Sequence, residues 1–212
     1  MNINKNQLLL YAVTDRAWLN GGTLADAVEA ALKGGATLVQ LREKNADTAA
    51  LIKTASEIKQ VCRRYDVPLI IDDNIEAVIK SGADGVHLGQ NDTPAQEARR
   101  ILGPDKIIGV TAKTPEQAIA AERDGADYLG SGAVFGTSTK SDAVKMEPET
   151  LRAITASVNS PVAAIGGITS ENILGLNGTG IAGVAVVSGI FAQRDIEKAT
   201  ADLTQLAREV VK

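Results

Sequence analysis

Three polar side chains at alternate positions follow one apolar run, in the stretch TLVQLREKN at residues 37–45. If the run is a strand, its side chains alternate between two faces, so Gln40, Arg42 and Lys44 share one face. With a rise of about 3.3 Å per residue, these groups extend over roughly 13 Å. Arginine offers a planar fork of hydrogen-bond donors, and lysine a compact positive charge. This face is therefore suited to a polyanion such as diphosphate.

Carboxylates follow two other apolar runs. Asp73 comes directly after the run PLIID (68–72), and Asp92 lies shortly after the run GVHLG (85–89). If both runs are parallel strands, their carboxyl ends meet at one rim, where the two carboxylates could ligate one hard cation. Oxygen ligands, retained water and substrate phosphate are the usual surroundings of Mg²⁺. The sequence thus predicts an Mg²⁺ site at Asp73 and Asp92, although Asp92 could instead cap a helix that starts near Pro94.

The elements that must position these groups are eight short apolar runs separated by helical patterns. The helical segments carry apolar residues three and four positions apart, and the longer ones open on Thr, Asp or Ser. The runs are LLLYAV (8–13), TLVQL (37–41), PLIID (68–72), GVHLG (85–89), KIIGV (106–110), DYLGS (127–131), PVAAIG (161–166) and GVAVVS (183–188). Eight such units predict an α/β fold, a single (β/α)8 TIM barrel over residues 1–212. A doubly wound open sheet is the alternative, but it would not need eight evenly spaced units.

A second anion site is expected after the seventh and eighth runs. In a barrel the active site lies at the carboxyl ends of the strands, and phosphate often binds after the last two. Gly166, Gly167 and Ser188 are expected to expose backbone N–H groups at helix starts, where the helix dipole favours negative charge. The alternative for the glycine pair is a tight turn.

Two further residues invite a chemical role but are better explained by structure. His87 alternates with Val86 and Leu88, so we expect a hydrogen-bonded structural histidine rather than a general base. Cys62 lies within a helical pattern and is expected to pack in the core.

Composition narrows the class of protein. The chain has 212 residues, 44% of them hydrophobic, and a net charge of −4, which suits one sizeable core. Mild acidity argues against a nucleic-acid partner or an anionic membrane surface. A single cysteine excludes an internal disulfide, and the N-terminal apolar run is too short for a signal peptide or a membrane span, so a cytoplasmic protein is expected. The sequence does not indicate an oligomeric state.

A set of motifs spread over nearly the whole chain is highly specific in combination. They are YAVTD, QLREK, the Asp-Asp pair after the third run, GVHLGQND, GVTAKT, GTSTKSD, AIGGIT and VVSGI. With these motifs in this order, the chain resembles the thiamine phosphate synthase (thiamine-phosphate pyrophosphorylase) family. The resemblance implies a transferase that joins 4-amino-5-hydroxymethyl-2-methylpyrimidine diphosphate to a thiazole phosphate, with Mg²⁺ as cofactor, giving thiamine phosphate and diphosphate.

The resemblance also implies roles for particular residues. Those implied for the pyrimidine diphosphate are Gln40, Leu41, Arg42, Glu43, Lys44, Asp72, Thr111 and Lys140. Among them, the catalytic groups are Arg42, Lys44 and Lys140. Those implied for the thiazole phosphate are Thr137, Ser138, Thr139, Gly167, Val187 and Ser188. The metal ligands are Asp73 and Asp92.

Two departures from the family's pattern bear on the alternatives. Asp72 stands where the family commonly has Asn, which adds a negative charge beside a dianionic group. Lys113 stands where many members, and the related thiazole tautomerases, carry His, so a tautomerase is disfavoured. A non-catalytic sensor of phosphorylated ligands is the third hypothesis. It would be expected to lose Arg42, Asp73, Asp92 or Lys140, and all four are present.

Overall fold

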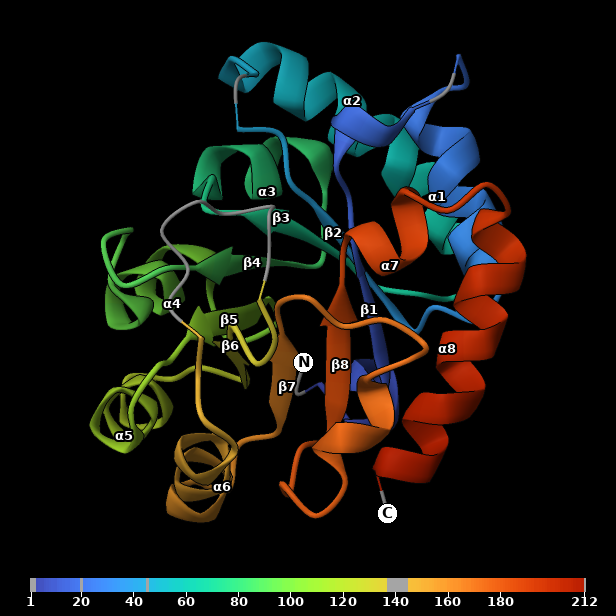
Figure 1. Cartoon of the computed structure of the whole chain (residues 1–212). Coiled ribbons are helices and arrows are strands. Elements are labelled where there is room, and N and C mark those ends of the chain that lie inside the picture. The colour runs from blue at the N-terminus through green and yellow to red at the C-terminus, as the bar shows by residue number, and fades with distance from the viewer. Residues whose placement is uncertain (1–2, 20, 45, 137–144, 212) are drawn as a thin grey trace.

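The computed structural model describes residues 3–19, 21–44, 46–136 and 145–211, which form a closed barrel of eight parallel strands. Each strand pairs with the next along the chain, and β1 pairs with β8 to close the barrel. Figure 1 shows the helices on the outside, with α8 running beside α1. The predicted (β/α)8 barrel is confirmed.

The strands lie within one or two residues of the predicted runs at most ends. They are β1 (Leu10–Val13), β2 (Leu38–Leu41), β3 (Leu69–Asp72), β4 (Gly85–Leu88), β5 (Ile107–Thr111), β6 (Tyr128–Gly132), β7 (Val162–Ile165) and β8 (Gly183–Val186). The α-helices are α1 (Leu24–Lys33), α2 (Thr48–Arg64), α3 (Ile75–Ser81), α4 (Ala95–Leu102), α5 (Pro115–Arg123), α6 (Pro148–Ser157), α7 (Ser188–Phe191) and α8 (Ile196–Val210). The 3₁₀ turns are η1 (Lys5–Leu8), η2 (Arg16–Trp18) and η3 (Ile173–Leu176).

Alternation along the strands divides the core into two clusters. Outward residues such as Leu41 and Val86 pack with the helices, and Cys62 of α2 is buried in this outer cluster as predicted. Inward residues such as Tyr11 and Tyr128 form a separate inner cluster that fills the barrel. Position along a strand therefore decides whether a side chain supports the helices or faces the barrel interior.

A repeated Gly-Ala turn explains how several strands begin. The sequence Gly-Ala-Thr or Gly-Ala-Asp precedes β2, β4 and β6, and each glycine has a positive φ, between 72° and 97°. The third residue then accepts a hydrogen bond from the first backbone N–H of the preceding strand, as with Thr37 and Leu10 at 2.9 Å, and Asp84 and Leu69 at 2.7 Å. Asp127 does the same one residue into β5, for Ile108 at 2.8 Å. The turn thus links neighbouring strands at the amino-terminal end of the barrel.

The N-terminal segment closes this same end. Ile3 and Leu8 are buried in the inner cluster, with Leu8 fully so. The predicted strand at 8–13 begins too early, because the Asn4 side chain accepts from Gln7 N–H and caps the turn η1, which ends at Leu8. Likewise, the predicted run 183–188 is too long, since Ser188 begins α7.

Among the described residues, no helix is long and apolar enough to cross a membrane. The expectations of a cytoplasmic location and of no nucleic-acid partner remain predictions.

Candidate active site

A cavity of about 300 Å³ opens at the carboxyl ends of the strands. Every strand contributes at least one residue to its lining, and the loops that follow β2, β3, β4 and β8 add charged and polar groups. Ten of the predicted site residues line it: Gln40, Arg42, Lys44, Asp72, Asp73, Asp92, Thr111, Gly167, Val187 and Ser188. The fold therefore brings together groups that lie up to about 150 residues apart, as the strand-end argument predicted.

The end of β2 separates its side chains by alternation. Gln40, Arg42 and Lys44 reach the cavity. Leu41 instead packs in the outer cluster with no exposed surface, and the Glu43 carboxylate turns away to meet the Arg16 guanidinium at 2.8 Å. The side chains of Leu41 and Glu43 therefore lie on the face of the strand opposite the cavity, and their implied contact with a diphosphate stays a prediction that only their backbone could fulfil in this conformation.

Arg42 is the most deeply placed cation of the cavity. Its side chain is 10% exposed, and its Nε lies 3.5 Å from an Asp72 carboxylate oxygen. Its terminal Nη2 is buried and has no hydrogen-bond partner among the described residues. A buried guanidinium donor without a partner is costly, so the folded chain bears a cost in stability to keep this positive charge beside the cavity.

Asp73 is turned by an unusual backbone. Its φ is +56°, a left-handed conformation that Asp tolerates better than most residues, and its backbone N–H donates to the His87 carbonyl at 2.9 Å. The following Asn74 caps α3 by accepting from Ala77 N–H at 2.8 Å. The carboxylate of Asp73 is therefore left for the cavity rather than used as a helix cap.

Asp92 does not cap α4. That helix begins after Pro94 and has no side-chain cap bond. Asp92 instead accepts a hydrogen bond from Gly89 N–H at 2.6 Å, which folds the turn after β4 and brings the carboxylate to the cavity rim. The alternative reading of Asp92 as an N-cap is wrong, because its carboxylate is already engaged one turn earlier.

The two carboxylates influence each other. Partial desolvation raises the pKa of Asp73, and the negative charge of Asp92 raises it further, while Arg42 and Lys44 oppose the rise. A cation placed between the carboxylates would relieve this repulsion. Among the described residues, no group of three or more His, Cys, Asp or Glu side chains is arranged to hold a metal. Two carboxylates are thus the acidic ligands that the described residues offer to a cation here.

The inner end of the cavity contains a hydrogen-bonded group that the sequence argument missed. Gln40 Nε2 donates to the Tyr11 hydroxyl at 2.6 Å, and that hydroxyl lies 2.8 Å from the hydroxyl of Tyr128. His87 joins Tyr128 through Nδ1 and Thr111 through Nε2, both at 3.0 Å, so its prediction as a hydrogen-bonded histidine is confirmed. The tyrosines carried no signal of their own, because an inward tyrosine in a strand resembles any apolar residue.

The glycine-rich end of β7 packs closely against the loop after β6. Gly166 and Gly167 have φ values of +106° and +67°, and side chains there would overlap Ala133 and the Gly136 carbonyl. The expectation that both glycines start a helix is wrong, since η3 begins only at Ile173. The glycines serve a tight turn that lines the cavity, while Ser188 does begin a helix, α7.

Four of the predicted residues, Thr137, Ser138, Thr139 and Lys140, lie outside the described residues. Lys113, noted in the sequence but not assigned a role, lines the cavity after β5.

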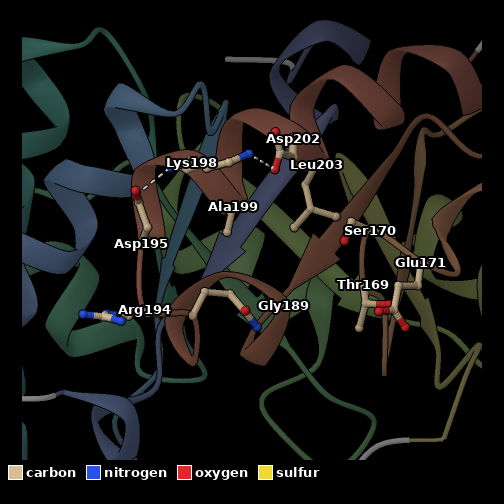
Figure 2. Close-up of a pocket in the computed structure, with 11 residues that line it drawn as sticks. Thr169, Ser170, Glu171, Gly189, Arg194, Asp195, Lys198, Ala199, Asp202 and Leu203 are labelled. Carbon is tan, nitrogen blue, oxygen red and sulfur yellow. Dashed lines mark hydrogen bonds and ion pairs between the residues drawn. The ribbon is translucent and has the colours of Figure 1, made fainter.

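A second cavity of about 410 Å³ lies outside the barrel, around the start of α8. Figure 2 shows Lys198 of this helix between Asp195, which caps the helix, and Asp202 one turn further along. Its backbone N–H donates to Asp195 at 2.9 Å, and its ammonium group pairs with Asp202 at 2.7 Å. These groups stabilise the helix itself, so the cavity at the strand ends is the better candidate for catalysis.

The chain is similar over nearly its whole length to known proteins of one family. The family described as thiamine monophosphate synthase matches residues 10–190. A thiamine-phosphate synthase from Ruminiclostridium cellulolyticum is 48% identical over 203 residues, covering 96% of this chain and 97% of that protein. One from Clostridium tetani is 47% identical, covering 97% and 99%. The solved structure of thiamine phosphate pyrophosphorylase from Pyrococcus furiosus superposes with a TM-score of 0.90 at 39% identity, covering 98% and 99%.

Proposed function

The chain belongs to the thiamine monophosphate synthase family, and from this premise we propose how its cavity works. The enzyme joins 4-amino-5-hydroxymethyl-2-methylpyrimidine diphosphate to a thiazole phosphate, releasing diphosphate and forming thiamine phosphate. The observation that carries the proposal is that the cations Arg42 and Lys44 line one cavity together with the carboxylates Asp73 and Asp92.

The reaction breaks one bond and forms another at the same carbon. The methylene C–O bond breaks, and its electron pair leaves with the diphosphate. The aminopyrimidine ring spreads the positive charge of the methylene, which the thiazole nitrogen then attacks with its lone pair to form the new C–N bond. No base is required for this attack, which suits a cavity whose histidine is already hydrogen-bonded through both ring nitrogens.

Stabilising the leaving diphosphate is the main task of the side chains. Arg42 and Lys44 face the cavity from the same side of β2 and supply fixed positive charge where negative charge gathers. Arg42 is held by Asp72 at 3.5 Å, so its guanidinium needs little rearrangement when the ligand arrives. We assign Lys140 the same role from the family resemblance alone.

Asp73 and Asp92 are the residues that would hold Mg²⁺. Two carboxylates fit this ion, because their mutual repulsion favours a cation and because Mg²⁺ usually keeps water and substrate phosphate as its other ligands. When bound, Mg²⁺ neutralises charge on the diphosphate oxygens.

The thiazole phosphate is assigned to the opposite side of the cavity. Gly167, Val187 and Ser188 line it there, close to the short helix α7. Backbone N–H groups of such a turn suit a phosphate dianion. Thr137, Ser138 and Thr139 are assigned to the same phosphate on the resemblance.

A direct assay tests the proposal. The purified protein is incubated with both substrates and Mg²⁺, and thiamine phosphate is measured against reactions that lack one component or contain a chelator. We expect product only in the complete mixture. A folded protein that yields no thiamine phosphate would refute the proposal and revive the sensor hypothesis, which binding of the pyrimidine diphosphate without turnover would then support.

A further inference from the structure

Five side chains form one continuous line of hydrogen bonds across the inner end of the cavity. They come from five strands and run in the order Gln40, Tyr11, Tyr128, His87, Thr111, with successive distances of 2.6, 2.8, 3.0 and 3.0 Å. Gln40, Tyr11, His87 and Thr111 line the cavity, and Tyr128 is the one member of the line that does not. Tyr128 in the middle has no exposed surface and begins β6 two residues before Gly130, which does line the cavity.

The glycines around the line show that the barrel is built to admit it. A side chain at Gly109 would overlap the Tyr128 ring, and one at Gly130 would lie 3.0 Å from the His87 ring. Gly109 pairs with Tyr128 in the register of β5 and β6, so the missing side chain leaves the space that the ring occupies. The line is therefore a packed part of the barrel rather than a chance set of contacts.

Each tyrosine hydroxyl has one proton, and this fixes a single donor-to-acceptor direction along the line. Burial raises the pKa of both Tyr11 and Tyr128, so each hydroxyl keeps its single proton. Each hydroxyl has two partners in the line, and can donate to one and accept from the other. If the direction changed along the line, a buried hydroxyl would face another proton or lose its acceptor, which is costly.

The Gln40 amide sets the direction. Because its Nε2 donates to Tyr11, the Tyr11 hydroxyl donates to Tyr128, and Tyr128 donates to Nδ1 of His87. The His87 proton then sits on Nε2 and is donated to the Thr111 oxygen. Two groups remain for the cavity, the amide oxygen of Gln40 as an acceptor and the hydroxyl proton of Thr111 as a donor.

We propose that this hydrogen-bond line makes Tyr128 a specificity-determining positioning residue, which fixes an acceptor at Gln40 and a donor at Thr111 without touching the substrate. The inference rests on the proposed function and deepens it. An aminopyrimidine carries an amino donor together with ring-nitrogen and diphosphate acceptors. It therefore matches both ends of the line, whereas a pyrimidine without the amino group matches only the Thr111 end.

The test uses Tyr128→Phe, which keeps the ring beside Gly109 and removes one link. Dissociation constants are measured, without thiazole phosphate, for the aminopyrimidine diphosphate and for its analogue lacking the amino group. We expect the wild type to prefer the amino ligand by about tenfold, and the variant to lose most of this preference. A purely structural loss would weaken both ligands equally and leave the ratio unchanged.

Three further variants keep the result interpretable. Tyr11→Phe breaks the neighbouring link and should give the same loss of preference. Because Tyr11 itself lines the cavity, this variant supports the proposal together with Thr111→Val, which removes the far end of the line and should also reduce the preference. An unchanged ratio in Tyr11→Phe overturns the proposal even if Tyr128→Phe fails to fold. Tyr65→Phe is the control, because it deletes a hydroxyl that bonds Glu29 at 3.0 Å outside the barrel, and should leave the ratio unchanged.

The outcomes separate the two proposals. An unchanged ratio in folded Tyr128→Phe and Tyr11→Phe, with normal wild-type turnover, overturns the positioning role alone. A wild type that neither binds the amino ligand preferentially nor forms thiamine phosphate overturns both.

Discussion

Both ends of the barrel carry an arginine beside an aspartate, but the pair is closely hydrogen-bonded at one end and loosely paired at the other. At the amino-terminal end, Asp127 accepts from Ile108 N–H at 2.8 Å and pairs with Arg99 at 2.6 Å. At the carboxyl end, Arg42 meets Asp72 at 3.5 Å, and its Nη2 has no hydrogen-bond partner in the part of the chain that the structure describes. One end uses its charges to hold the strands together, while the other keeps them for a ligand.

The contrast extends to the details of each carboxylate. Arg99, the partner of Asp127, also donates to the carbonyl oxygens of Gly103, Lys106 and Gly125, so its guanidinium binds several turns together. Asp73, in contrast, has a strained left-handed backbone and a raised pKa beside a second carboxylate. Local arrangements that cost stability therefore gather at the end where chemistry is proposed.

The largest expected effect comes from Asp73→Asn, which removes one charge at the carboxyl end and keeps a residue that tolerates positive φ. Turnover with Mg²⁺ should fall by about a hundredfold or more, because a ligand of the metal is lost. The free energy of unfolding should not decrease, since no described partner depends on this carboxylate. Steady-state kinetics and urea denaturation measure the two effects. Full activity in the variant would remove Asp73 from the metal site.

Asp127→Ala makes the opposite change at the amino-terminal end. It leaves Ile108 N–H and the Arg99 guanidinium without their shared acceptor, so the free energy of unfolding should fall by about 2 kcal/mol. The maximal rate should stay within about twofold, because the residue lies far from the cavity.

Asp124→Ala is the matched control for this change. Asp124 pairs with Arg123, whose side chain is 73% exposed, so its loss should cost less than about 0.5 kcal/mol. Equal losses of stability in the two variants would contradict the distinction between the ends.

Thr37→Val sharpens the comparison, because Thr37 is the uncharged member of the repeated turn. The change keeps the branched shape and deletes the acceptor of Leu10 N–H, so stability should fall by about 1 kcal/mol. Thr37→Ser, which retains the hydroxyl, should recover most of the loss. If denaturant unfolding gives Thr37→Val the same stability as the wild type, the turn's hydrogen bonds contribute little to the free energy of unfolding.

The smallest expected effect is a pH dependence at Asp73 in the absence of divalent cations. Desolvation and the charge of Asp92 raise the pKa of Asp73. At pH values just above the ordinary aspartate pKa of about 3.9, the folded chain therefore binds more protons than the unfolded chain. Wild-type stability should therefore fall relative to Asp73→Asn as pH rises from about 4 towards neutrality. The difference should stay below about 1 kcal/mol because the carboxylate is partly exposed. Urea unfolding of both proteins at several pH values measures this. A stability difference between wild type and Asp73→Asn that does not change with pH would count against the raised pKa.

The sequence predicted the barrel and much of the rim because both follow from short-range periodicity. Alternation alone places Gln40, Arg42 and Lys44 on the cavity side of β2. The same alternation places the side chains of Leu41 and Glu43 on the opposite face, and their assignment to the diphosphate came from the motif as a whole.

What the sequence could not supply depends on contacts between distant strands. The hydroxyl pair of Tyr11 and Tyr128 joins residues 117 positions apart and follows from the empty space at Gly109. Asp92 was open to a capping role until the structure showed its carboxylate on Gly89 N–H. Such choices are made by tertiary geometry, which no local pattern contains.

The turn η1 near the N-terminus also closes the amino-terminal end of the barrel, because its residue Leu8 is buried in the inner cluster. Leu8 lies in the same inner cluster as Tyr11 and Tyr128, and Gly183 has no side chain where the Leu8 carbonyl approaches β8. A deletion that removes Leu8 would take away part of the packing of the inner cluster and expose its amino-terminal side to water, which would compete for the tyrosine hydroxyls. A deletion at the amino-terminal end of the barrel would therefore reduce the preference for the aminopyrimidine ligand at the carboxyl end.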